Sequence, residues 1–168
     1  MRTRGEWPKR RHRSPVEGDG TASTPAVPGP TVLVVGTDDW AIDQAAEALA
    51  DAGSPVLRCH EPGAPAFPCN ALVEGRTCPL DIGFDVVATV RARAGGAPAQ
   101  SEFGVVCGVR AGVPLVVAGL AADRPFGSWA AATVEQGGDL VSTCRAVAEQ
   151  CAVDQAIATH HVPEGAHS

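Results

Sequence analysis

The strongest constraint on the fold is an alternation between short β-branched runs and amphipathic helical segments. The run TVLVVG (31–36) is almost wholly apolar, which is typical of a strand buried on both faces of a sheet. TDDWAIDQAAEALADAG (37–53) follows, with apolar residues at helical spacing, acidic residues in its first turn and a glycine at its end. A second short run, SPVLRC (54–59), completes a strand–helix–strand unit, which predicts a parallel pair of strands.

The same alternation recurs along the rest of the chain. Further strands are predicted over FDVVATV (84–90), VPLVVAG (113–119) and SWAAATVE (128–135). Helices are predicted over PAQSEFGVVCGVRAG (98–112) and over residues 137–160. We therefore expect an α/β fold, a three-layer sandwich whose parallel sheet has about five strands in the flavodoxin-like or receiver-like order 2-1-3-4-5.

Each of the two later helices carries one stripe of residues at helical spacing. In the helix at 98–112 the stripe consists of Phe103, Val106, Cys107 and Arg110. In the helix at 137–160 it consists of Leu140, Cys144, Val147 and Cys151. Gly104 and Gly108 would let the backbone of the first of these helices approach the sheet closely. We interpret the cysteines of both helices as small core residues.

Composition divides the chain of 168 residues into one domain and two tails. Residues 1–30 are rich in Arg, Pro, Gly, Ser and Thr, and we expect a disordered basic tail. Residues 31–160 are expected to form a single α/β domain with a cysteine-containing crossover loop at 59–83, and residues 161–168 a frayed tail.

Charge and hydropathy exclude several classes of partner. Residues 31–168 carry seven arginines and sixteen acidic residues, so the folded domain repels phosphates and nucleic acid is not an expected partner. No apolar run approaches the roughly 20 residues of a membrane span, and no signal-peptide pattern is visible at the N-terminus. We therefore expect a cytoplasmic location, in which thiols stay reduced.

The stretch VLVVGTDDWAIDQAAEALADAGSPVLRC (32–59) resembles the opening of a response-regulator receiver domain. Asp38 and Asp39 match the acidic pair that holds magnesium in that family. The third predicted strand ends in Thr89 and Val90, where a receiver has its phosphoacceptor aspartate, and no lysine follows the fifth strand. The resemblance thus implies a receiver-like fold without phosphoryl transfer, and we expect no uptake of phosphate from a small phosphodonor.

The same stretch is also similar to the start of a dinucleotide-binding Rossmann domain. Asp38 stands where the second glycine of the G-x-G-x-x-G fingerprint belongs, and its charge would repel the pyrophosphate. This resemblance implies NAD or FAD binding and supports only the weakest of our functional alternatives, a nucleotide-binding enzyme domain.

In an open parallel sheet, ligands bind beyond the carboxyl ends of the strands. Polar side chains follow three of the predicted strands there, and we predict a ligand-binding edge formed by Asp38, Asp39, His60, Glu61, Arg91 and Arg93. For the two aspartates, capping of the following helix is the competing interpretation. No catalytic residue can be assigned, because the sequence lacks a G-x-S-x-G elbow, a phosphate loop and an H-E-x-x-H motif.

The crossover CHEPGAPAFPCNALVEGRTCPLD (59–81) contains four prolines and cannot form a long regular helix. Its cysteines, Cys59, Cys69 and Cys78, lack the C-x2-C spacing of structural zinc sites. Three alternatives stay open: buried thiols, a zinc or iron–sulfur site, and a disulfide or redox pair. We also hypothesise that Cys69 and Cys78 lie close together and that the loop covers the edge of the sheet near Cys59 and Asp38.

These observations favour a non-catalytic cytoplasmic binding or regulatory domain whose partner is a protein or a small molecule. The main alternative is a small thiol- or metal-dependent redox protein that uses Cys59, Cys69 and Cys78.

Overall fold

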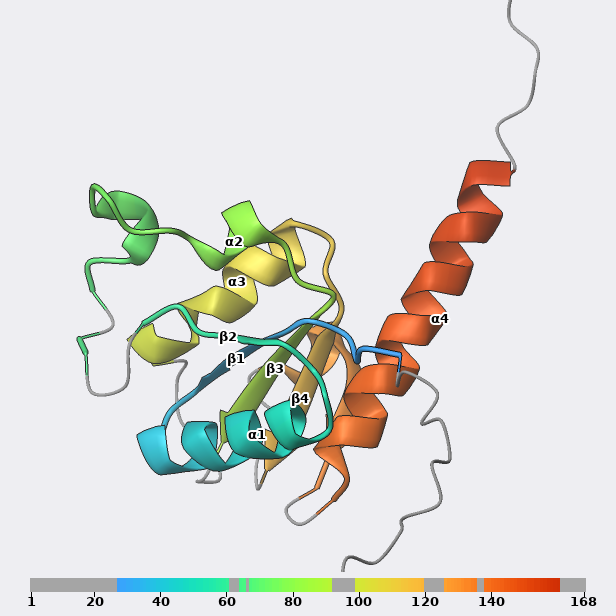
Figure 1. Ribbon diagram of the computed structural model, residues 1–168, viewed down its shortest axis with the longest axis horizontal. Coiled ribbons are helices and arrows are strands. Elements are labelled where there is room, and N and C mark those ends of the chain that lie inside the picture. The colour runs from blue at the N-terminus through green and yellow to red at the C-terminus, as the bar shows by residue number, and fades with distance from the viewer. Residues whose placement is uncertain are drawn as a thin grey trace, which may run out of the picture.

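The computed structural model describes residues 27–60, 64–65, 67–91, 99–119, 126–135 and 138–160. Five strands form one sheet in the order β2-β1-β3-β4-β5, and every neighbouring pair is parallel, which confirms the predicted architecture (Figure 1). The strands are β1 (Val32–Gly36), β2 (Val56–Leu57), β3 (Val86–Arg91), β4 (Leu115–Gly119) and β5 (Ala130–Val134).

Helices cover both faces of this sheet (Figure 1). The α-helices are α1 (Asp39–Asp51), α2 (Pro79–Ile82), α3 (Phe103–Arg110) and α4 (Leu140–His160). Three short 3-10 turns are η1 (Asn70–Leu72), η2 (Gln100–Glu102) and η3 (Gly127–Trp129). One core cluster lies between the sheet and the helices α1 and α4, whereas a second lies on the face covered by α3. Within the part of the chain described, no helix combines the length and hydrophobicity needed to cross a lipid bilayer.

Helix α1 begins and ends where the sequence predicts. The Asp38 carboxylate accepts a hydrogen bond from the backbone amide of Ala41 at 3.0 Å, so this residue is the N-cap. Ile42 and Leu49 are buried against the sheet, as their helical spacing requires. Gly53 follows the helix with φ +81°, a left-handed conformation that only glycine adopts without strain.

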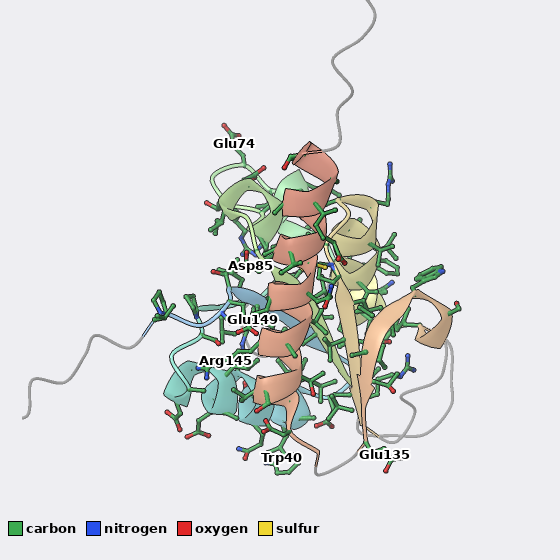
Figure 2. The ribbon with its side chains drawn as sticks, turned by 90° about the vertical axis from the view of Figure 1, so that its right-hand side faces the viewer. Trp40, Glu74, Asp85, Glu135, Arg145 and Glu149 are labelled. Carbon is green, nitrogen blue, oxygen red and sulfur yellow. The ribbon has the colours of Figure 1, made fainter. Side chains whose placement is uncertain are left out.

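Helix α4 packs on the same face of the sheet as α1 and extends beyond the edge of the sheet (Figure 2). Cys144 is fully buried, and Leu140 and Val147 are partly buried beside it, as their stripe predicts. The Arg145 guanidinium donates a hydrogen bond to the carbonyl of Ala52, which ties α4 to the end of α1. Residues 152–159 are exposed, because the helix has passed the edge of the sheet by that point.

The predicted orientation of α3 is wrong. Phe103, Val106 and Arg110 are exposed, and the residues that face the sheet are Gly104, Val105 and Gly108. The large apolar residues of α3 therefore face away from the core. The face that carries the glycines packs on β1 and β3, because residues without large side chains permit a close approach. The expectation that the two glycines allow a close approach is confirmed, since a Cβ on Gly104 would lie 2.8 Å from Cγ1 of Val35.

Substitution of Gly108 tests this packing. A Cβ at this position would overlap Cγ2 of Val87, so we expect Gly108→Ala to destabilise the fold by roughly 1–3 kcal/mol despite its better helix propensity. The exposed Val106→Ala change on the same helix is the control and should stay within about 0.5 kcal/mol of wild type. Urea denaturation measures both, and a Gly108→Ala protein as stable as wild type would contradict the packing.

Four residues that we assigned to the N-terminal tail, 27–30, are described and lie against the domain. The amide of Gly29 donates to the carbonyl of Gly53 at 3.0 Å, and the amide of Thr31 donates to the Asp85 carboxylate at 2.7 Å. Residues 1–26 and 161–168 lie outside the described residues, so the predictions of a disordered and a frayed tail remain predictions.

Candidate functional site

The crossover from β2 to β3 has little regular structure. Between residues 59 and 83 the described residues form only the turn η1 and the four-residue helix α2, which begins at Pro79. A full crossover helix would fill the space over β1 with large side chains. The prolines prevent such a helix, and the space beside α3 is left partly empty.

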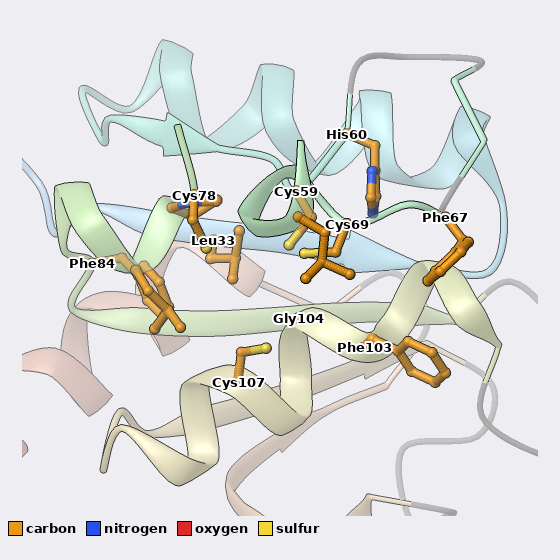
Figure 3. Close-up of a pocket in the computed structure, with 13 residues that line it drawn as sticks. Leu33, Cys59, His60, Phe67, Cys69, Cys78, Phe84, Phe103, Gly104 and Cys107 are labelled. Atoms are coloured by element: carbon orange, nitrogen blue, oxygen red, sulfur yellow. The ribbon is translucent and has the colours of Figure 1, made fainter. Parts of the chain in front are cut away.

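A cavity of about 210 Å³ occupies this space (Figure 3). We call it the thiol pocket, because four cysteines line it: Cys59, Cys69 and Cys78 from the crossover and Cys107 from α3. Leu33 of β1 lines the side next to the sheet. The other apolar residues of the wall are Phe67, Leu72, Pro79, Leu80, Phe84 and Phe103. Four of the lining residues are cysteines and one is Gly104, so small residues leave room for the cavity.

Helix α3 forms one wall of the thiol pocket and lies very close to the sheet. A Cβ on Gly104 would approach Sγ of Cys59 to 2.9 Å, so only glycine fits beside this sulfur. Cys107 follows one turn later and its side chain is directed into the cavity (Figure 3). We interpreted Cys107 from the sequence as a core residue, but it is partly exposed and belongs to the pocket.

Burial disfavours the charged form of two pocket thiols, Cys59 and Cys107. Burial raises the pKa of Cys59 from 9.0 to about 12, and the neighbouring Cys69, Cys107 and Cys78 add to the rise. Burial also raises the pKa of Cys107, with further contributions from Cys69 and Cys78, while Arg110 acts in the opposite direction. At neutral pH these two thiols keep their protons, which makes them weak nucleophiles and weak metal ligands in this state.

All six cysteines lie within the described residues, and each is a free thiol. In the same part of the chain, no three His, Cys, Asp or Glu side chains are arranged to share one metal ion. The donor set for zinc or an iron–sulfur cluster is therefore not assembled there. Cys69 and Cys78 do line a common cavity, together with Cys59, so the three sulfurs are not dispersed into separate pockets.

His60 lines the thiol pocket as well as a polar hollow on its other side. β2 ends at Leu57 and the chain bends at Cys59 and His60, and both residues line the pocket. Nδ1 of His60 is buried and has no hydrogen-bond partner in the structure. The hollow beside it carries Asp43, which pairs with Arg58 at 2.7 Å.

The other residues of the predicted ligand-binding edge have different surroundings. Asp38 caps α1, and Asp39 is exposed in its first turn. Arg91 is buried, forms an ion pair with Glu102 at 3.3 Å and lies over the ring of Phe126 at 5.7 Å. Glu61 and Arg93 lie outside the described residues. Ligand binding by this edge of the sheet remains a prediction.

The partner of Arg91 was not identified from the sequence. Glu102 is fully buried and accepts hydrogen bonds from the Thr89 hydroxyl at 3.0 Å and from the Ala99 amide at 2.9 Å. This network joins the end of β3 to the start of α3 and so fixes the helix that forms one wall of the thiol pocket. An acidic residue ahead of a helix is usually an exposed N-terminal charge, so no sequence pattern indicates that Glu102 is buried.

The class defined by this architecture is an α/β fold with flavodoxin-like sheet order. The chain matches no protein-family model. A search of curated proteins likewise gives no match.

Proposed function

We propose that this protein is a non-catalytic binding domain whose thiol pocket takes a small apolar ligand, about the size of one substituted aromatic ring. The observation that carries the proposal is the cavity of about 210 Å³ with an almost wholly apolar lining. An apolar cavity of about 150 Å³ is known to stay dry and to bind benzene. Sites for drug-sized ligands are larger, roughly 300–1,000 Å³, so the ligand is expected to be small.

The chemistry of the wall supports an uncharged ligand. No arginine, lysine, aspartate or glutamate is among the described residues that line the pocket. A phosphate or carboxylate would therefore lose its hydration without gaining a cation, which disfavours a nucleotide. Aromatic rings and thiols instead offer dispersion contacts to an apolar molecule.

The redox alternative has less support. A dithiol that exchanges electrons requires an accessible thiolate, whereas burial holds the pKa of Cys59 at about 12. A cytoplasmic location is part of the proposal, since a reducing compartment keeps the pocket thiols free. A bound ligand would contact both the crossover and α3, and we propose that occupancy orders these two elements together.

Filling the pocket tests the proposal. Cys107→Phe places a ring inside the cavity, and we expect it to weaken toluene binding by about tenfold or more, because the same space cannot be occupied twice. Val106→Phe is the matched control, since Val106 is exposed on the same helix and outside the pocket lining, and toluene affinity should stay at the wild-type value. Isothermal titration calorimetry measures all three proteins. Equal affinities, or no saturable binding by wild type, would refute the proposal.

A further inference from the structure

Cys59, Cys69 and Cys107 are all partly exposed, and Cys69 is distinguished among them by its place in the middle of the irregular crossover, far in sequence from β2 and α3. Cys78 is buried, and the sulfur of Cys59 lies against α3 where Gly104 leaves only enough room for it. Cys69 is partly exposed and lies in the irregular crossover, directly before η1, and its backbone carbonyl accepts a hydrogen bond from Leu72 at 2.8 Å. Cys69 thus belongs to the crossover side of the pocket and not to the side formed by the sheet. A molecule inside the pocket can reach its thiol there.

His60 supplies a proton acceptor in the same cavity. It lines the thiol pocket with Cys69, and in the view of Figure 3 its ring is directed toward the Cys69 side chain. Its buried Nδ1 has no partner in the structure, so this atom is available to accept a proton. The hollow on the other side of the ring also contains Glu47 and Asn70, and it connects His60 to solvent.

We propose that ligands of the thiol pocket include apolar α,β-unsaturated carbonyl compounds, an inference that rests on the proposed function. Cys69 captures these compounds covalently, and His60 is the general base. His60 takes the proton from the thiol, and the sulfur electron pair forms a bond to the β-carbon. The electrons of the C=C π bond move to the carbonyl as an enolate, and the proton returns from His60 to the α-carbon. The thiol has then added across the double bond, and no oxidant or reductant is consumed.

This assignment explains why an apolar cavity is surrounded by thiols. The lining selects an apolar molecule, and its confinement near Cys69 raises the effective concentration of the reacting carbon. Cys151 is a suitable internal reference, because it is partly exposed on α4 and does not line the pocket.

Two ketones that differ only in the double bond provide the test on the full chain. The unsaturated probe is 4-phenylbut-3-en-2-one, and the saturated probe is 4-phenylbutan-2-one, which can bind but cannot alkylate. Mass spectrometry should find one adduct on Cys69, formed at least about tenfold faster than any adduct on Cys151. Cys69→Ser should form no pocket adduct and still bind the saturated ketone. His60→Gln should slow adduct formation by about tenfold at a saturating concentration of the unsaturated ketone, where a change in affinity does not affect the rate.

The outcomes separate this inference from the proposed function. If the saturated ketone binds and the unsaturated ketone gives no adduct on Cys69, covalent capture is wrong and the binding function stands. Labelling of Cys151 as fast as Cys69 also overturns the inference, and an unchanged adduct rate in His60→Gln overturns the role of the histidine. If neither ketone binds, the proposed function and the inference both fail.

Discussion

Replacing Glu102 with alanine is expected to lower the free energy of unfolding by about 3–5 kcal/mol, the range found when one partner of a buried ion pair is removed. The side chains of Arg91 and Glu102 are 2% and 0% exposed, so the substitution leaves a guanidinium buried without its carboxylate. The Thr89 hydroxyl and the Ala99 amide lose their acceptor at the same time.

A double variant distinguishes the lost pairing from general disruption of α3. Arg91→Met with Glu102→Leu replaces both charges by apolar side chains, and it should recover the part of the loss that comes from the unpaired guanidinium, while Thr89 and Ala99 stay without their acceptor. Urea denaturation followed by circular dichroism at neutral pH measures the series. A loss below about 1 kcal/mol in Glu102→Ala would mean that the ion pair does not hold α3 against β3.

Alkaline pH is expected to destabilise the protein through its buried thiols. Burial raises the pKa of Cys144 from 9.0 to about 12, and Cys59 is raised to about 12 by burial and its neighbouring thiols. A raised pKa means that the folded state binds the thiol proton more strongly than the unfolded state does. The resulting contribution to stability is complete below pH 9 and is lost between pH 9 and 12. Each thiol should lower stability by about 1.4 kcal/mol per pH unit in this window.

Cys144→Val isolates one of the two thiols. Cys144 is fully buried, and valine fills a similar volume without a titrating group, so the slope above pH 9 should fall by about half in this variant. Val147→Ala serves as the control, since it removes methyl groups near the same site and keeps both thiols. Urea denaturation from pH 8 to 11 records the slopes. Stability that does not change above pH 9 in wild type would contradict the burial of these thiols.

Strand positions and sheet order could be predicted because each buried strand is a continuous β-branched run, and because strand–helix–strand units allow few topologies. The limits of β2 could not be predicted, since only Val56 and Leu57 pair with β1, although a strand was predicted over 54–59. The face of α3 was mispredicted because hydrophobic periodicity gives no weight to Gly104 and Gly108. Close packing depended on these two residues having no side chain.

The candidate site could be predicted only in part. The prolines of 59–83 indicated an irregular crossover, and the three cysteines there do share one cavity. Cys107 could not be assigned to that cavity, because its position depends on how α3 packs beside the crossover on the same face of the sheet. Glu102 and Arg91 are eleven residues apart in sequence, and nothing local shows that both are buried.

The most direct test of the binding function is a titration of the full chain with toluene, followed by two-dimensional ¹H–¹⁵N nuclear magnetic resonance. We predict saturable chemical-shift changes at the amides that surround the thiol pocket, above all those of Cys59, Cys69, Gly104 and Cys107. Signals of the distant end of α4, such as Val153, should not move. The absence of saturable changes at the pocket, or changes confined to the edge of the sheet at Asp38 and Arg91, would contradict the account.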